Sequence, residues 1–364
     1  MKLQVTQENL SKALSDVAKV AMSNKNPLPI LNNVLLRTND NRLSISATNL
    51  EIAISEKIGS KVKNDGSITV PARLIQEYIT SLPSGVIDLE LEEHKLHIGT
   101  EQFKSTINGV ASDDYPDIPK VEKEVEWSIP AKNFKKGLQQ VVFAASSDEA
   151  RPVLTGVYLK TVDSELYAAA TDSYRLAEKK LLKTKQDISL LVPASALQEL
   201  LRIIPENAEN IEVTADSQQV LFKVGDIELV SKLIDVPYPD YKKLIPKEFA
   251  VSATLARDEF VSITKVSSLF ARENAGSVTI KVNEDEKTIS IASIASQLGE
   301  NKSKASAKVS GEGEVTLNSR YLIDALNAIN TEEVTFSFNG KLEPCLITSE
   351  QAPDITYLVM PLKS

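Results

Sequence analysis

The residues able to carry catalytic chemistry are few and poorly placed in this sequence. Its two histidines, His94 and His97, both fall in the alternating stretch 91–99, where a spacing of three on a strand points them to opposite faces. Neither a shared metal ion nor a Ser–His–Asp site is therefore predicted. The single thiol, Cys345, lies in an apolar stretch and is expected to be buried and inert. Because no CxxC pair and no glycine-rich phosphate loop occurs, no metal and no cofactor is expected.

Two further segments carry polar groups at close spacing. Asp113, Asp114 and Asp117 lie in a segment rich in proline and charge, which favours an acidic linker over a cation site. The segment 171–176 reads Thr-Asp-Ser-Tyr-Arg-Leu and follows a small-residue strand. One interpretation is a turn in which Asp172 bonds nearby backbone and Arg175 pairs with a carboxylate. The other is a local function, because the corresponding segment 48–52 lacks the arginine.

Composition places the chain among globular proteins. Its 364 residues include 42% apolar and 25% charged side chains, and 41 basic against 50 acidic residues give a net charge of −9. That acidic balance argues against a surface that binds nucleic acid on every side, although one local basic face remains compatible with it. No apolar run approaches a membrane span and the first residues do not resemble a signal peptide, so a cytoplasmic location without a membrane partner is expected.

The chain repeats itself. Pro29, Val34 and Thr48 recur as Pro152, Val157 and Thr171, each 123 positions later. A second block starts at Val70, Val192 and Leu317, and Tyr115-Pro116-Asp117 recurs as Tyr238-Pro239-Asp240. We therefore predict three copies of one domain, at residues 1–124, 125–247 and 248–364. The proline-rich and charged segments 112–124 and 235–248 are expected to be extended connectors.

Each copy shows the same order of elements. Apolar residues at helical spacing, such as Leu10, Leu14 and Val17, alternate with polar residues on the opposite face. Short alternating stretches such as 43–47 and 288–291 predict half-buried strands. Pro71 and Pro193 are expected at the first position of a helix. The fold class is α+β, with two helices per copy against antiparallel sheets, and the helices are predicted at 6–20, 71–82, 130–144, 193–204, 256–270 and 318–330.

With these motifs in place, the sequence resembles the bacterial DNA polymerase III beta subunits, the replicative sliding clamps. The carriers are the threefold repeat and the segments 27–31 (PLPIL), 170–177 (ATDSYRLA), 238–241 (YPDY) and 357–362 (YLVMPL). The resemblance covers the whole chain. It implies a non-enzymatic processivity factor: a head-to-tail homodimeric ring, with helices lining the hole, that encircles duplex DNA without sequence specificity. The implied partners are the polymerase III catalytic subunit, the clamp loader and repair proteins.

Such partners would bind through short linear peptides in one pocket. The resemblance implies that it is built from Leu154, Thr171, Arg175, Leu176, Pro239, Lys243, Leu244, Asn318, Tyr321, Pro344, Leu358, Met360 and Pro361. Leucine, methionine and proline would form an apolar groove, with Arg175 or Lys243 as a charged rim. Ser173-Tyr174 and Lys243 replace the family's common Gly-His and Arg, which leaves the preferred peptide open. Removal of residues 358–364 is expected to abolish polymerase stimulation and to leave the dimer intact.

Helix number and charge are compatible with the ring. At about 9 Å spacing, six helices would enclose a bore of roughly 7 Å, whereas twelve would enclose about 24 Å, enough for a duplex. The six helix spans carry ten basic and seven acidic residues, a net +3, which leaves −12 elsewhere within the total of −9. The side chains expected to face DNA are Lys12, Lys19, Lys25, Arg73, Lys132, Lys135, Lys136, Arg202, Lys265 and Arg320.

Two other classes of function are compatible with parts of the sequence. A monomeric repeat scaffold that binds proteins and no DNA would have a molar mass of 39.8 kDa in solution, where the ring would have twice that mass. A hydrolase with scattered carboxylates would need a histidine, cysteine or phosphate motif in a suitable context, and none is found.

Overall fold

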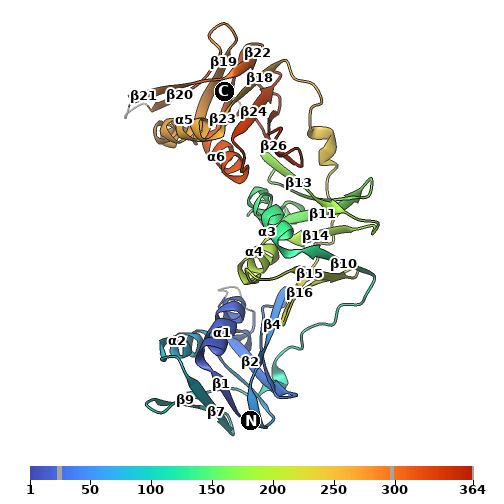
Figure 1. The fold of residues 1–364 in the computed structure, drawn as a ribbon, viewed down its shortest axis with the longest axis vertical. Helices are drawn as coiled ribbons and strands as arrows, with labels where there is room; N and C mark the ends of the chain where they lie inside the picture. The colour runs from blue at the N-terminus through green and yellow to red at the C-terminus, as the bar shows by residue number, and fades with distance from the viewer. Residues whose placement is uncertain (23–26, 296–298, 363–364) are drawn as a thin grey trace. The chain divides into compact units, whose positions relative to one another are not determined.

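The computed structural model describes residues 1–22, 27–295 and 299–362, so Lys25 lies outside the described residues. Two compact units form the chain (Figure 1). The first unit comprises residues 1–132 and 198–233, and the second comprises residues 133–197 and 234–364. In the described part, no helix is long and apolar enough to cross a membrane.

Two antiparallel sheets build the first unit. The smaller has the order β5-β1-β7-β8-β9 and the larger the order β10-β15-β16-β17-β4-β3-β2-β6. The larger sheet combines four strands of the second copy with four of the first, joined where β17 pairs with β4. The strands are β1 (Lys2–Thr6), β2 (Asn33–Asn39), β3 (Arg42–Thr48), β4 (Ile52–Gly59), β5 (Lys61–Asn64), β6 (Ser67–Pro71), β7 (Val86–Glu92), β8 (Lys95–Gly99), β9 (Lys104–Asn108), β10 (Val125–Pro130), β15 (Asn210–Ala215), β16 (Gln219–Val224) and β17 (Ile227–Lys232).

The second unit is built in the same way. Its larger sheet has the order β14-β11-β12-β13-β26-β25-β24-β18-β22, joined across copies where β13 pairs with β26, and its smaller sheet has the order β21-β20-β19-β23. The strands are β11 (Gly156–Val162), β12 (Glu165–Thr171), β13 (Arg175–Lys183), β14 (Ser189–Pro193), β18 (Val251–Ala256), β19 (Ser277–Asn283), β20 (Thr288–Ala295), β21 (Gly299–Ser306), β22 (Lys308–Ser310), β23 (Gly313–Asn318), β24 (Glu333–Phe338), β25 (Cys345–Thr348) and β26 (Ile355–Val359).

Six α-helices follow the predicted spans closely. Apolar residues of α1, among them Leu10, Leu14 and Val17, are fully buried against β3 and β4, and Phe260 of α5 is buried in the same way. This is the burial that the helical spacing of apolar residues predicts. The helices are α1 (Gln7–Ala21), α2 (Ala72–Ser81), α3 (Ala131–Gln139), α4 (Ala194–Ile203), α5 (Arg257–Phe270) and α6 (Ser319–Ala328).

Two details of the predicted helices are wrong. Helix α3 ends at Gln139 and not at 144, because the chain continues as a separate 3-10 turn, Val142–Ala144. Pro71 and Pro193 do not occupy the first helical position: each is the last residue of a strand, and Pro71 caps α2 with a ψ of 117°. The proline ring therefore ends the strand ladder one residue before the helix begins.

The α+β class with three tandem copies is confirmed. Each copy runs strand, helix, at least four strands, helix and three strands. The order from the first helix onward is as predicted, and the strand before that helix was not predicted. The first connector begins with a 3-10 turn, Ser112–Asp114, and residues 116–123 form neither helix nor strand before β10 begins. The second connector contains one short 3-10 turn, Tyr241–Leu244.

Candidate partner-binding site and basic helix faces

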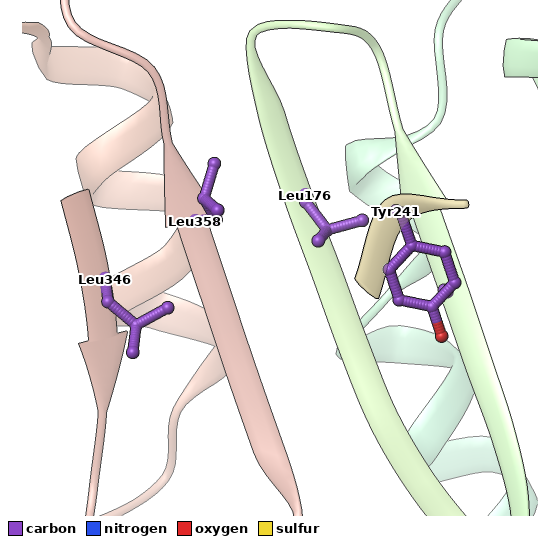
Figure 2. Packing of buried hydrophobic residues seen from close by; sticks show 5 residues of the cluster. Leu176, Tyr241, Leu346 and Leu358 are labelled. Carbon is purple, nitrogen blue, oxygen red and sulfur yellow. The ribbon is translucent and has the colours of Figure 1, made fainter. Parts of the chain in front are cut away.

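Four of the predicted pocket residues, Arg175, Leu176, Leu358 and Met360, lie together where β13 meets β26, which we call the second joint. Arg175 pairs with Val359 and Leu176 with Leu358 in this antiparallel ladder. Figure 2 shows Leu346 and Leu358 on neighbouring strands, with Leu176 and Tyr241 on the other side of the joint. These four residues and Ala169 are buried, and Met360 packs against them half-exposed. The joint thus has an apolar floor with a methionine at its margin.

The turn that precedes β13 is fixed by its own side chains. Asp172 accepts hydrogen bonds through Oδ1 from the backbone N–H groups of Tyr174 and Arg175, each at 2.9 Å. Thr171 donates through Oγ1 to the carbonyl of Arg175 at 2.6 Å. These bonds hold Ser173 at a φ of +78°, in the left-handed region. The turn interpretation of the sequence is correct.

Arg175 links this turn to α6. Its guanidinium donates to Asp172 at 3.0 Å, to Asp324 at 2.6 Å and to the carbonyl of Phe143 at 2.7 Å. The same group lies 4.7 Å from the centre of the Tyr321 ring, a cation–π contact. Because only 14% of the side chain is exposed and its donors are occupied, Arg175 positions the turn and is not a free charge at the rim.

A buried carboxylate supports the other side of the joint. Glu178 accepts a hydrogen bond from the hydroxyl of Tyr241 at 2.5 Å and pairs with Lys242 at 2.5 Å. Burial, and then the nearby charge of Glu178, raise the pKa of Tyr241 far above its ordinary value, so the phenol stays a hydrogen-bond donor. The Lys242 ammonium also lies 4.0 Å from the centre of the Tyr167 ring.

The remaining predicted pocket residues differ in exposure. Leu154 is buried and Pro344, Pro361 and Tyr321 are half-buried, whereas Pro239 and Leu244 are exposed. Lys243 is 82% exposed and pairs with Asp240 at 2.9 Å. Asn318 caps α6 by accepting a hydrogen bond from the Arg320 N–H at 2.9 Å, which gives it a structural role.

Apart from Tyr321, sequence reasoning missed the aromatic part of this site. Tyr158 stacks on Tyr238, and Tyr174 stacks on Tyr321 with ring centres 6.5 Å apart. Tyr174 is exposed, and its carbonyl accepts a hydrogen bond from the Met360 N–H at 2.8 Å. The repeated tyrosine of the 238–241 motif was the available signal, since an aromatic residue kept at one register of two copies indicates a packing position.

The predicted DNA-facing residues that the structure describes lie on all six helices. Lys12 and Lys19 lie on α1, Arg73 on α2, Lys265 on α5 and Arg320 on α6, all exposed. Helix α3 carries Lys132, Lys135 and Lys136, and its charge accounts for the net +3 of the helices. Arg202 on α4 differs, because it pairs with Glu199 at 2.8 Å and donates to the carbonyls of Ser15 and Asp16.

The histidines belong to the first unit, whereas Cys345 lies on β25 opposite Val359 of β26. His97 lies on β8 and shares a hydrogen bond with Thr106, but His94 lies in the turn before β8 and not on a strand as predicted. Among the described residues, no three acidic, histidine or cysteine side chains are arranged to hold a metal ion. Burial raises the pKa of the Cys345 thiol to about 12, which makes it unreactive at neutral pH.

Comparison with known proteins decides the family. The N-terminal, central and C-terminal domain models of the DNA polymerase III beta subunit match residues 1–119, 128–240 and 242–363. The chain belongs to the DNA polymerase III beta subunit family. The family resemblance drawn from the sequence is thereby confirmed.

Individual members of the beta subunit family match along their whole length. The beta sliding clamps of Synechocystis and Bacillus subtilis are each 31% identical, covering the full chain here and 99% and 100% of those proteins. The crystal structure of the B. subtilis clamp superposes with a TM-score of 0.95 at 29% identity, covering 100% and 99% of the two chains. A Pseudomonas aeruginosa clamp bound to griselimycin has a TM-score of 0.94 at 25% identity, covering both chains fully.

Proposed function

We propose that two copies of this chain close head to tail into a ring around duplex DNA and hold DNA polymerase III on it. The chain is then an accessory subunit without catalytic chemistry of its own, and its bacterial DNA partner places it in the cytoplasm. Its three domains are proposed at residues 1–124, 125–247 and 248–364. The observation that supports the ring is that two sheet edges stay available for pairing after both joints within the chain have formed.

Both joints within the chain follow one rule. The last strand of the second copy, β17, pairs with β4, the third strand after the first helix of the first copy. In the same way β26, the last strand of the third copy, pairs with β13, the third strand after the first helix of the second. Two equivalent strands remain: β9 is the last strand of the first copy, and β21 is the third strand after the first helix of the third copy. Each is the edge of its sheet. Pairing β9 of one chain with β21 of another satisfies both edges.

Exposed apolar side chains flank both of these edges. Phe103 directly precedes β9 and is 43% exposed. On the other edge, Val266 and Leu269 of α5, which packs on β21, and Ile294 at the end of β20 are 46%, 50% and 64% exposed. Contact between these two groups would remove apolar surface from water, which stabilises an interface in addition to the strand pairing.

The basic helix faces support the DNA partner. Lysines and arginines that contact phosphates carry no sequence information, so a ring lined with them holds DNA and still slides. The excess charge lies on α3, where Lys132 and Lys136 are exposed. A net charge of −9 over the whole chain repels DNA from other surfaces.

The second joint is proposed as the pocket for the peptides of polymerase, clamp loader and repair proteins. Met360 and the exposed Leu244 and Tyr174 offer apolar contacts, and Lys243 offers a charge at the margin. A partner peptide would insert one or two leucine or phenylalanine anchors between these side chains. Arg175 then acts as a positioning residue through the turn.

Molar mass in solution tests the ring most simply. Light scattering at micromolar concentration is expected to give twice the chain mass of 39.8 kDa. Ile294→Asp should shift the mass to that of one chain, because it would bury an unpaired charge at the β9–β21 contact. Leu342→Asp is the matched control, since Leu342 is equally exposed at 64% and lies between β24 and β25. A wild-type chain that stays monomeric would exclude the ring and favour the scaffold.

A further inference from the structure

We propose that the pairing of β4 with β17, the first joint, carries a second binding site, for an extended segment of a partner protein that presents one leucine-sized side chain next to a basic residue. This inference rests on the proposed peptide pocket at the second joint, because it assigns the same mode of binding to the corresponding position one copy earlier. The two joints repeat each other closely in detail.

The turns before the two joints have the same hydrogen bonds. Asn49 accepts through Oδ1 from the N–H groups of Glu51 and Ile52, at 3.0 and 2.8 Å, as Asp172 does in the second turn. Thr48 donates to the carbonyl of Ile52 at 3.0 Å. Leu50 has a φ of +74°, close to the +78° of the corresponding residue in the second turn. The backbone available to a ligand is therefore presented in the same way at both joints.

The strands meet in the same register as well. The Lys232 N–H donates to the carbonyl of Glu51 at 2.9 Å, as the Met360 N–H donates to that of Tyr174 at 2.8 Å. Ala53 pairs with Val230 in the first joint, at the positions that Leu176 and Leu358 occupy in the second.

The smaller side chains at the first joint leave a hollow. It has a volume of about 280 Å³ and includes Leu50, Ile52, Ala53, Gln219, Val230 and Lys232 in its lining. This is just below the range of about 300–1,000 Å³ typical of small-ligand sites, and it suits one aliphatic side chain with its backbone. Leu50 is 38% exposed at the margin, so apolar surface continues outward from the hollow.

One residue of the lining has a buried polar atom without a partner in the described part of the chain. Gln219 lines the hollow, and its Oε1 is buried without a hydrogen bond. A buried acceptor without a donor costs free energy, and a backbone N–H of a bound peptide would recover it once the Gln219 amide turns toward the hollow. This favours an extended peptide over a purely apolar ligand.

The charge around the hollow selects a different peptide from that of the second joint. Glu51 and Asp117 contribute two carboxylates, against the single ammonium of Lys232. In the second joint the positions of Glu51 and Pro119 are taken by Tyr174 and Lys242. The first joint is therefore the more acidic of the two, so a basic residue beside the anchor is favoured there.

The test uses acetyl-Gly-Lys-Leu-Lys-Gly-amide as the probe, titrated into the full chain labelled at its methyl groups. We expect NMR shifts at Leu50, Ile52 and Val230, with the shifts of Leu176, Leu358 and Met360 unchanged. Peptides with alanine in place of leucine, or with glutamate in place of both lysines, should bind at least tenfold more weakly. Shifts centred on the second joint, or equal binding of the three peptides, would overturn the proposal.

A variant in which larger side chains fill the hollow is the matched control for the wild-type chain. Ala53→Leu with Val230→Leu introduces the pair of leucines that the second joint carries, and should weaken the probe at least tenfold. Unchanged probe affinity in this variant overturns the second site. If the wild-type chain is monomeric and does not remain on circular DNA, while the probe still shifts Leu50, Ile52 and Val230, the proposed ring is wrong and the second site stands.

Discussion

Arg175 connects the second and third copies through one guanidinium group. Its guanidinium connects the turn at Asp172 with Asp324 on α6, and its aromatic neighbours exclude water from these bonds. A lysine would keep the charge but lose the forked geometry that reaches both carboxylates and the Phe143 carbonyl.

Arg175→Ala is expected to lower the free energy of unfolding of the second unit by about 2–4 kcal/mol, because two carboxylates lose their partner in a largely buried site. Labelling of the buried Cys345 thiol in denaturant measures this loss, since Cys345 belongs to the same unit. Arg151→Ala, which removes an exposed ion pair with Asp148, should change it by less than about 1 kcal/mol. Equal effects of the two variants would refute the positioning role.

Glu56 on β4 makes the first unit sensitive to pH. Burial, and then the nearby charges of Asp16 and Asp226 against that of Lys12, raise the pKa of Glu56 to about 7. The unfolded carboxyl loses its proton near its ordinary pKa of 4.5, while the folded one keeps it, so stability falls as pH rises from about 4.5 to about 7.

Glu56→Gln should therefore stabilise the first unit by up to about 3 kcal/mol at pH 8 and leave it nearly unchanged at pH 4. Fluorescence of Trp127, the single tryptophan, reports unfolding of this unit. Glu228→Gln on the adjacent strand is the control, because that side chain is partly exposed and paired with Lys223. A stabilisation of the same size at both pH values would show that the charge of Glu56 is not its cause.

At the scale of elements, the C-terminal strand is part of the core of the second joint. Leu358 and Val359 belong to β26, pair with both β13 and β25, and are buried. Removal of residues 358–364 would therefore open the apolar floor of the second joint, and not only remove a tail. The strand ends at Val359, so Met360 is the first residue beyond it.

Removal of residues 360–364 is the cleaner truncation. We expect it to keep the molar mass of the dimer, to lower the stability of the second unit less than removal of 358–364 does, and to reduce binding of a polymerase-derived peptide at least tenfold. Removal of 358–364 should also lower the stability of this unit by about 2–5 kcal/mol, through loss of a buried leucine. Peptide binding that survives loss of Met360 and Pro361 would contradict their place in the pocket.

The helices, the repeat and the α+β class follow from the sequence because they depend on local spacing. Leu10, Leu14 and Val17 mark a buried helix face wherever the helix packs. The joints do not follow in this way. Ala53 and Val230 are far apart in sequence, and only the pairing of β4 with β17 shows that their small side chains leave a hollow. Asp324, one partner of Arg175, could not be predicted for the same reason, because it lies in another copy.

At the scale of the whole molecule, the proposed ring depends on the edge strands β9 and β21. In the first copy Leu3 pairs with Leu89, Leu89 with Ile98, and Ile98 with Ser105. In the second copy Trp127, Val213, Phe222 and Leu229 pair in the same sequence. Ser105 therefore corresponds to Leu229, and the next residue, Thr106, corresponds to Val230. On the other edge, Ile294 of β20 pairs with Glu300 of β21, as Thr48 of β3 pairs with Ala53 of β4. The pairing of β19 with β20 shows that Ile294 corresponds to Thr48, so Glu300 corresponds to Ala53. If the proposed ring keeps the register of the inner joints, Thr106 of one chain lies opposite Glu300 of the next.

Covalent closure around DNA tests the ring most directly. A chain with Thr106→Cys and Glu300→Cys is mixed with circular plasmid and joined by a short bismaleimide, to which the buried Cys345 is inert. The account predicts a closed dimer that stays with the plasmid in denaturing detergent and high salt and is released when the plasmid is cut. Crosslinked chains that leave the intact circle as readily as the cut one would contradict it.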